Sequence, residues 1–227
     1  MTSRADALAY LETELLAPQV FGPDRLRLVQ IPFVPEMRLL LAEDAVVWWA
    51  RMEADAGAAL TAPFWATAWP GGQAVARYVL DRPAMVAGRR VLDVASGSGL
   101  VAIAAAVAGA AAVTANDIDP YALAAVTLNA RANGVAVTTC QADLLDGDGG
   151  DAQVVLAGDA FYQEALAQRI WPFLTRAAAR GARVLIGDPG REYLPRDGLA
   201  TVASYPAPAA DTSAEPHIRH ISVLQPR

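Results

Sequence analysis

The segment VLDVASGSG at residues 91–99 constrains the fold more than any other part of the sequence. The apolar run at 90–94 is typical of a short buried strand, and Gly97 and Gly99 allow a tight turn that approaches a ligand closely. The apolar segment 100–107 is predicted to be a helix, whose first N–H groups would face that ligand. A strand, a glycine loop and a helix in this order indicate a ligand-binding α/β domain.

The rest of the chain continues this alternation of strands and helices. We predict further strands at 112–115, 135–140, 152–157 and 182–187, and helices at 120–132 and 163–180. Two last strands, at 199–205 and 218–224, would form a hairpin around a loop at 207–216. Right-handed crossovers would place helices on both faces of the sheet. The predicted fold is a Rossmann-like α/β domain with seven strands, mostly parallel, and a C-terminal antiparallel hairpin.

The N-terminal part has a different pattern. Helical spacing and short apolar runs predict a helix at 5–17 and strands at 26–34 and 37–42, and a further helix is predicted at 72–81. A length of 227 residues, 54% of them hydrophobic, suits one α/β domain with an extension. We therefore expect residues 1–60 to form an extension that serves as a substrate rim, and residues 61–227 to form the α/β domain.

Composition excludes several classes of partner. The net charge is −6 and no basic run is present, which disfavours a nucleic-acid partner. The most apolar stretch, 101–113, is too short to span a bilayer, so we expect no membrane partner. A single cysteine, Cys140, suits a reducing compartment, and we expect a cytoplasmic location. His217 and His220 would point to opposite faces of one strand, so we expect no metal site.

Asp93 distinguishes between two classes of nucleotide ligand. Gly97, Gly99 and Ala102 also satisfy the dinucleotide pattern G-x-G-x-x-A. However, a carboxylate at the end of the strand is unfavourable beside a pyrophosphate, whereas it would stabilise the ammonium group of a methionine moiety. The motif also begins about ninety residues into the chain, and dinucleotide motifs usually open their domain. The predicted cofactor is therefore S-adenosyl-L-methionine.

Carboxylates after the next strands would complete the donor site. Asp117 is placed to accept hydrogen bonds from ribose hydroxyls, and Asp143 from the adenine amino group, with Ile118 and Leu144 flanking the ring. The predicted donor-binding residues are Trp69, Asp93, Ser96, Gly97, Gly99, Asp117, Ile118, Asp143, Leu144 and Gly158.

Three further motifs carry a family resemblance. Residues 158–162, GDAFY, place Asp159 and Tyr162 in a D-x-x-Y pattern after the fourth strand. Together with WPGGQ at 69–73 and GDPGR at 187–191, this pattern resembles the electron transfer flavoprotein β-subunit lysine methyltransferases, which are seven-β-strand, D-x-x-Y protein-lysine methyltransferases. The resemblance covers roughly residues 60–195 and departs from the family pattern at Ser98, where relatives often have cysteine.

The resemblance implies methyl transfer from S-adenosylmethionine to lysines of the flavoprotein β subunit. The attacking amine must be neutral, although the pKa of a free lysine is about 10.4. We predict that Asp159 and Tyr162 are catalytic, and that Asp159 aligns the incoming lysine because no cationic partner is evident nearby in the sequence. The predicted substrate channel consists of Phe64, Trp65, Phe161 and Arg191. The alternatives are a small-amine (nicotinamide-like) N-methyltransferase, methylation of another protein such as a ribosomal protein, or a non-catalytic donor-binding module.

Overall fold

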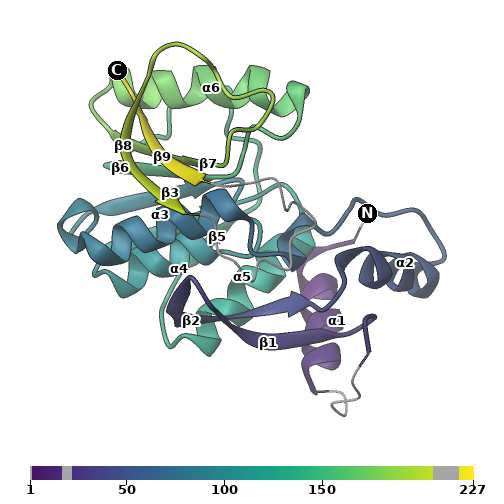
Figure 1. Ribbon diagram of the computed structural model, residues 1–227. Helices are drawn as coiled ribbons and strands as arrows, with labels where there is room; N and C mark the ends of the chain where they lie inside the picture. The colour runs from purple at the N-terminus through teal and green to yellow at the C-terminus, as the bar shows by residue number, and fades with distance from the viewer. Residues whose placement is uncertain (1, 17–21, 207–219) are drawn as a thin grey trace.

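The computed structural model describes residues 2–16, 22–206 and 220–227 (Figure 1). One seven-stranded sheet has the order β5-β4-β3-β6-β7-β9-β8. Its parallel strands are β3 (Arg90–Val94), β4 (Ala112–Asn116), β5 (Thr138–Cys140), β6 (Val154–Gly158) and β7 (Arg183–Asp188). β8 (Leu199–Pro206) and β9 (His220–Pro226) pair antiparallel, and β9 runs antiparallel to β7. The predicted fold class is confirmed; the predicted loop at 207–216 and His217 lie outside the described residues.

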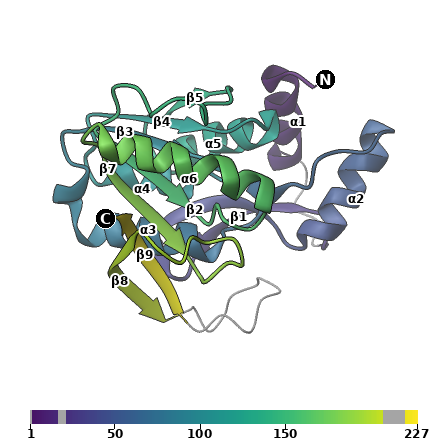
Figure 2. The ribbon, with the colours of Figure 1, turned by 90° about the horizontal axis from the view of Figure 1, so that it is seen from above.

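Helices cover both faces of this sheet (Figures 1 and 2). On one face lie α3 (Pro70–Asp81), α4 (Leu100–Val107) and α5 (Pro120–Ala132), and their apolar residues form one core with alternate strand residues such as Val91 and Leu156. On the other face, α6 (Glu164–Ala179) buries Ile170 and Phe173 against Leu92 and Val155. Successive strand residues therefore point into two separate cores, as the period of two in a strand requires.

The N-terminal segment packs on the outer side of this helical layer. It contains α1 (Arg4–Leu16), the antiparallel pair β1 (Leu26–Ile31) and β2 (Val34–Ala42), and α2 (Ala45–Ala56). Residues of β1 and β2 share a core with α3, α4 and α5, while α1 and α2 pack near α5. The division of the chain at residue 60 stays a prediction.

Helix α2 is absent from the sequence-based expectations. Asp44 begins it, because its carboxylate accepts hydrogen bonds from the backbone N–H groups of Val46 and Val47. Gly57 ends it in a left-handed conformation. The buried residues Trp48 and Met52 are four apart, which was the available signal of a helical face.

Helix α3 begins at Pro70, two residues earlier than predicted, after a short 3₁₀ helix η1 (Phe64–Ala66). Gly71, which precedes the helix predicted at 72–81, therefore lies in its first turn together with Pro70 and Gly72. Proline suits the first helical position because its missing N–H is not needed there. A second 3₁₀ helix, η2 (Pro83–Met85), follows α3. None of the helices in the described ranges combines the length and apolar content that crossing a bilayer requires.

Candidate active site

Four aspartates lie at the carboxyl ends of neighbouring parallel strands. Asp93 is in β3, Asp117 follows β4, Asp159 follows β6 and Asp188 ends β7. Because these strands are parallel and adjacent, the four residues share one edge of the sheet, where α/β sheets bind their ligands. Asp93, Asp159 and Asp188 are buried.

Asp93 is connected to the glycine loop by a backbone hydrogen bond. Its Oδ2 accepts from the N–H of Ala102 in the first turn of α4, at 3.0 Å. Within the described residues its buried Oδ1 has no hydrogen-bond partner, and neither has the buried Oγ of Ser96. Burial raises the pKa of Asp93 to about 8. Both atoms can therefore accept hydrogen bonds from a ligand that enters this edge.

Asp117 supports the glycine loop from the neighbouring strand. Its Oδ2 accepts from the N–H of Gly97 at 2.9 Å and its Oδ1 from the N–H of Asp119 at 3.0 Å. Burial raises the pKa of Asp117. Gly99, at φ +80°, has no room for a Cβ, which would lie 2.9 Å from Cγ2 of Val126. The loop therefore requires glycine, and α4 and α5 approach closely beside it.

Asp159 has a cationic partner, so the expectation of a carboxylate without one is wrong. Its Oδ1 accepts from Nε of Arg191 at 2.6 Å, and its Oδ2 accepts from the N–H of Gly71 at 2.8 Å. The side chains of Asp159 and Arg191 are 1% and 13% exposed, so the ion pair is largely excluded from water. The two residues are thirty-two positions apart in the sequence, and only the adjacency of β6 and β7 brings them together.

The loop after β7 orients Arg191 through hydrogen bonds to its backbone. Oδ1 of Asp188 accepts hydrogen bonds from the N–H groups of Gly190, at 2.6 Å, and Arg191, at 2.7 Å. The guanidinium carbon of Arg191 lies 5.7 Å from the ring centroid of Trp69, a cation–π distance. The motif GDPGR thus forms a turn that directs the guanidinium at Asp159.

Three glycines let α3 approach the same edge. A Cβ on Gly71 would lie 2.3 Å from the carbonyl oxygen of Gly187, and a Cβ on Gly158 would lie 2.7 Å from Cα of Gly72. No side chain fits between these backbones. The glycines of WPGGQ, GDAFY and GDPGR therefore bring the first turn of α3 onto β6 and β7, where Gly71 reaches Asp159.

Three aromatic side chains, Phe64, Trp69 and Tyr162, contact one another close to the pair of Asp159 and Arg191. The ring centroids of Phe64 and Tyr162 are 5.0 Å apart, and those of Phe64 and Trp69 are 6.2 Å apart. Tyr162 is 36% exposed, and burial, with Asp117 and Asp159 nearby, raises its pKa. Two predicted channel residues are wrong, because Trp65 and Phe161 are almost completely buried in the cores beside α5 and α6.

Comparisons with known proteins agree with this geometry. Residues 76–166 match the family model of ribosomal protein L11 methyltransferase (PrmA). The electron transfer flavoprotein beta subunit lysine methyltransferase of Xenopus laevis is 36% identical over 98% of this chain and 84% of its own length. The chain belongs to this family of lysine methyltransferases. The mouse member is 44% identical, but the match spans 62% of its length and 69% of this chain.

The solved structure of ribosomal protein L11 methylase from Lactobacillus delbrueckii subsp. bulgaricus has the same fold. It superposes with a TM-score of 0.50 at 24% identity, over 69% of this chain and 78% of its own. Together with the strand order, this likeness confirms the methyltransferase fold. The predicted family is confirmed by the frog relative.

The other residues predicted to bind the donor differ from one another in exposure and in partners. Ile118 is 72% exposed beside Asp117, and Leu144 is partly buried against the α6 core. The carboxylate of Asp143 is exposed and paired with Arg169, at 2.6 and 3.1 Å, which lowers its pKa. The adenine acceptor predicted at Asp143 would therefore have to share this carboxylate with a guanidinium.

Three polar residues of the site were not predicted from the sequence. Asn116 donates two hydrogen bonds, to the carbonyl oxygens of Cys140 and Ala142, and so fixes the segment that leads to Asp143. Asn129 donates to the carbonyl oxygen of Ser98 and thereby ties α5 to the glycine loop. Asp188 orients Arg191. The available signal was their position at strand ends or in a buried helix face, where polar residues need partners.

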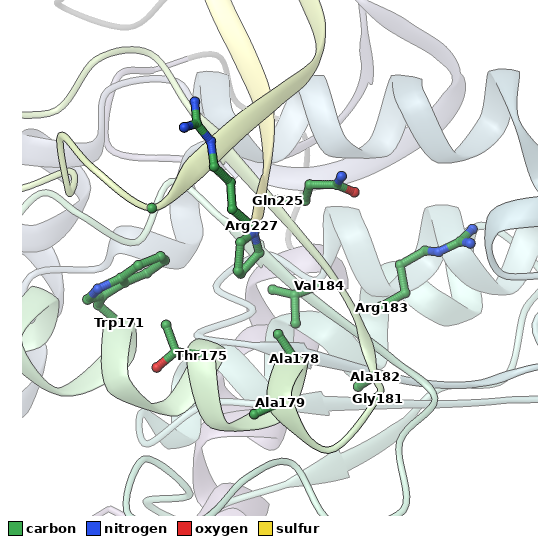
Figure 3. A pocket seen from close by; sticks show the side chains of 12 residues that line it. Trp171, Thr175, Ala178, Ala179, Gly181, Ala182, Arg183, Val184, Gln225 and Arg227 are labelled. Atoms are coloured by element: carbon green, nitrogen blue, oxygen red, sulfur yellow. The ribbon is translucent and has the colours of Figure 1, made fainter.

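A surface cavity of about 620 Å³ lies away from this edge (Figure 3). Trp171 and Thr175 of α6 line it together with Arg183, Gln225 and Arg227. Arg183 is the first residue of β7 and Asp188 the last, so the cavity lies at the opposite end of the strand. In the described part of the chain no group of three or more His, Cys, Asp or Glu residues is arranged to hold a metal ion.

Proposed function

We propose that this chain transfers methyl groups from S-adenosylmethionine to lysine side chains of the electron transfer flavoprotein β subunit. Relatives matched over up to 98% of this chain carry that activity in their names. The observation that carries the proposal is the buried pair of Asp159 and Arg191, with Tyr162, at the same edge of the sheet as the glycine loop, in a family whose named substrate is a lysine.

The donor would bind at the ends of β3 and β4. The orphaned buried atoms, Oδ1 of Asp93 and Oγ of Ser96, fit a ligand with an ammonium group and other donors. Asp117 would accept from ribose hydroxyls, Ile118 and Leu144 would flank the adenine, and Gly97 and Gly99 would allow close approach. Trp69, Asp143 and Gly158 would complete this site. S-adenosylmethionine, when bound there, supplies the electrophilic methyl group.

The lysine would enter between Phe64, Trp69 and Tyr162. These rings would exclude water from the amine and so favour its neutral form. Tyr162, which is close enough to both Asp117 and Asp159 for their charges to affect its pKa, connects the two halves of the site. Asp159 would align the lysine through the ion pair with Arg191 rather than by direct capture, since its oxygens already accept hydrogen bonds. Positioning would supply most of the rate.

The N-terminal segment would provide the rim on which a protein substrate docks. Val46 and Val47, in the first turn of α2, are 72% and 37% exposed, although both are large apolar residues. The partly exposed Tyr162 leaves the acceptor side open to the surface. Both features favour a protein over a small amine such as a pyridine, which a closed pocket would suit better.

A labelled-donor assay tests the proposal. Purified chain, donor and the flavoprotein β subunit of the same host are incubated, and the labelled lysines are identified by peptide mass spectrometry. All 18 residues counted as Lys or Arg in this chain are arginines, so any methyl-lysine found comes from the substrate. The proposal is refuted if the β subunit stays unlabelled while a pyridine-type amine or another cell protein is methylated.

A further inference from the structure

The pair formed by Asp159 and Arg191 poses an electrostatic problem for lysine methylation. A carboxylate next to an amine raises the pKa of that amine, yet only the neutral amine can attack a methyl group. The nitrogen forms its bond to the methyl carbon while the carbon–sulfur bond breaks and its electron pair stays on sulfur. One proton must therefore leave the ammonium group for water beforehand.

We propose that Arg191 is a positioning residue that keeps the substrate amine deprotonated. Its guanidinium cancels the charge of Asp159, so the pair presents no net negative charge to the amine that attacks beside it. This inference rests on the proposed function and assigns a role to a residue of the same site.

The contacts indicate that Arg191 stays in place during turnover. Its backbone N–H is bound by Asp188, its Nε lies 2.6 Å from Asp159, and its guanidinium carbon lies 5.7 Å from the ring centroid of Trp69. Its side chain is only 13% exposed. Removing one partner of such a buried ion pair is strongly unfavourable, because an uncompensated charge remains. A substrate lysine would therefore bind beside this pair.

The charged groups around the amine determine whether its pKa is raised or lowered. Asp159 follows β6, Asp117 follows β4 and Asp188 ends β7, while Tyr162 lies in the loop after β6. Burial raises the pKa of Asp188 to about 6, so this residue is mostly ionised above neutral pH. Arg191 provides the opposing positive charge. Without it, the surrounding carboxylates would hold the lysine in its ammonium form.

The test is the pH dependence of kcat, which reports ionisations in the enzyme–substrate complex. In the wild type, kcat should rise with pH through the pKa of the bound amine. In Arg191→Met the midpoint should move up by about one pH unit or more, with an about tenfold lower kcat below both midpoints. In Asp159→Asn it should move down, and in the double variant it should return close to the wild-type value.

Arg191→Met leaves a buried carboxylate without its guanidinium, so its thermal unfolding and donor affinity are measured alongside. If it fails to fold, the comparison of Asp159→Asn with the double variant carries the test. The midpoint of Asp159→Asn, which keeps the guanidinium alone, should lie below those of the wild type and of the double variant, and equal midpoints would overturn the proposal. Arg191→Lys keeps the positive charge and should have a midpoint close to that of the wild type; a midpoint raised as far as in a folded Arg191→Met would overturn the proposal as well, because the charge would then be irrelevant.

Arg191→Lys also tests whether the side chain at position 191 lies where the amine of the substrate lysine would bind. It places the only lysine of the chain there, since the wild type has none. We expect no methylation at position 191 after incubation with donor alone; a methylated peptide would overturn the proposal. A wild type inactive on the flavoprotein refutes the proposed function before any profile is recorded. An active wild type and an Arg191→Met variant with identical midpoints refute only the role of Arg191.

Discussion

The candidate site has two halves, a donor half at the ends of β3 and β4 and an acceptor half at the ends of β6 and β7. The carboxylates of the two halves have different partners. At the ends of β3 and β4, Asp93 and Asp117 accept hydrogen bonds from backbone N–H groups. At the ends of β6 and β7, Asp159 is neutralised by the guanidinium of Arg191. The donor half thus leaves the ionised form of its carboxylates to be stabilised by a cationic ligand, whereas the acceptor half supplies its own counter-charge. A site that must bind one cation and deprotonate another needs both arrangements.

The largest effect is expected for Asp159→Asn. The amide can still accept from Gly71 but cannot form an ion pair with Arg191, so the acceptor half loses its alignment. Methyl transfer should fall at least about a hundredfold, while donor affinity stays almost unchanged. Tyr162→Phe is the control and should lose less, because its ring still packs on Phe64. Steady-state kinetics and calorimetry measure the two quantities; near-wild-type turnover in Asp159→Asn would remove Asp159 from the mechanism.

Asp117→Ala should produce the complementary result. Donor affinity should fall by roughly 1–3 kcal/mol, because ribose hydroxyls would lose a charged acceptor and Gly97 would lose its support. Asp119→Ala is the matched control, since Asp119 caps α5 through the N–H of Tyr121. That change should lower the free energy of unfolding by about 1 kcal/mol and leave donor binding intact. Equal donor affinities in both variants would place the donor elsewhere.

The donor half was the easier one to predict because its contacts are local in sequence. The strand at 90–94, the helix at 100–107 and the helix at 120–132 with Asp119 as its cap agree with the structure. In each of them, apolar period, glycine position and capping residue indicate the same element. Glycine loops are also recognisable over nine residues, 91–99.

The acceptor half depends on contacts that no local pattern contains. Asp159 and Arg191 meet because β6 pairs with β7, and Gly71 reaches them only because three glycines remove every side chain in between. Sequence reasoning placed Trp65 and Phe161 in the channel because apolar aromatic residues suit a core and a channel equally well. Burial, which follows from tertiary packing, distinguishes the two.

A smaller effect is expected on the pH dependence of the unfolding free energy, through Asp93 in the donor half. Burial raises the pKa of Asp93 to about 8, far above its unfolded value of 3.8. Its contribution to stability is therefore complete below pH 3.8 and is lost as pH rises through 8. Between pH 6.5 and 8 the ligand-free chain should lose about 1 kcal/mol of unfolding free energy per pH unit from this group.

Asp93→Asn should flatten this part of the profile, measured by urea unfolding at each pH. Asp119, with a pKa near 6, titrates mainly below this window and serves as a check through Asp119→Asn. Saturating donor should reduce the loss in the wild type, because a bound ammonium group would stabilise the ionised carboxylate. An unchanged slope in Asp93→Asn would show that another group causes the pH dependence.

The smallest effect compares the two non-glycine residues that have positive φ, one in each half of the site among the described residues. Asp159, at φ +63°, belongs to a residue type that visits this region more readily and is fixed by its ion pair. Ala95, at φ +53°, has no side-chain contact of that kind. The left-handed conformation costs alanine roughly 1–2 kcal/mol. Replacing Ala95 by glycine removes this cost, but the greater conformational entropy of the unfolded chain offsets part of the gain in stability. Ala95→Gly should therefore raise the unfolding free energy by about 0.5 kcal/mol, while Ala112→Gly, on an exposed strand position, should lower it. Urea unfolding of both variants decides the matter, and a destabilised Ala95→Gly chain would mean that the methyl group of Ala95 contributes packing at the donor half.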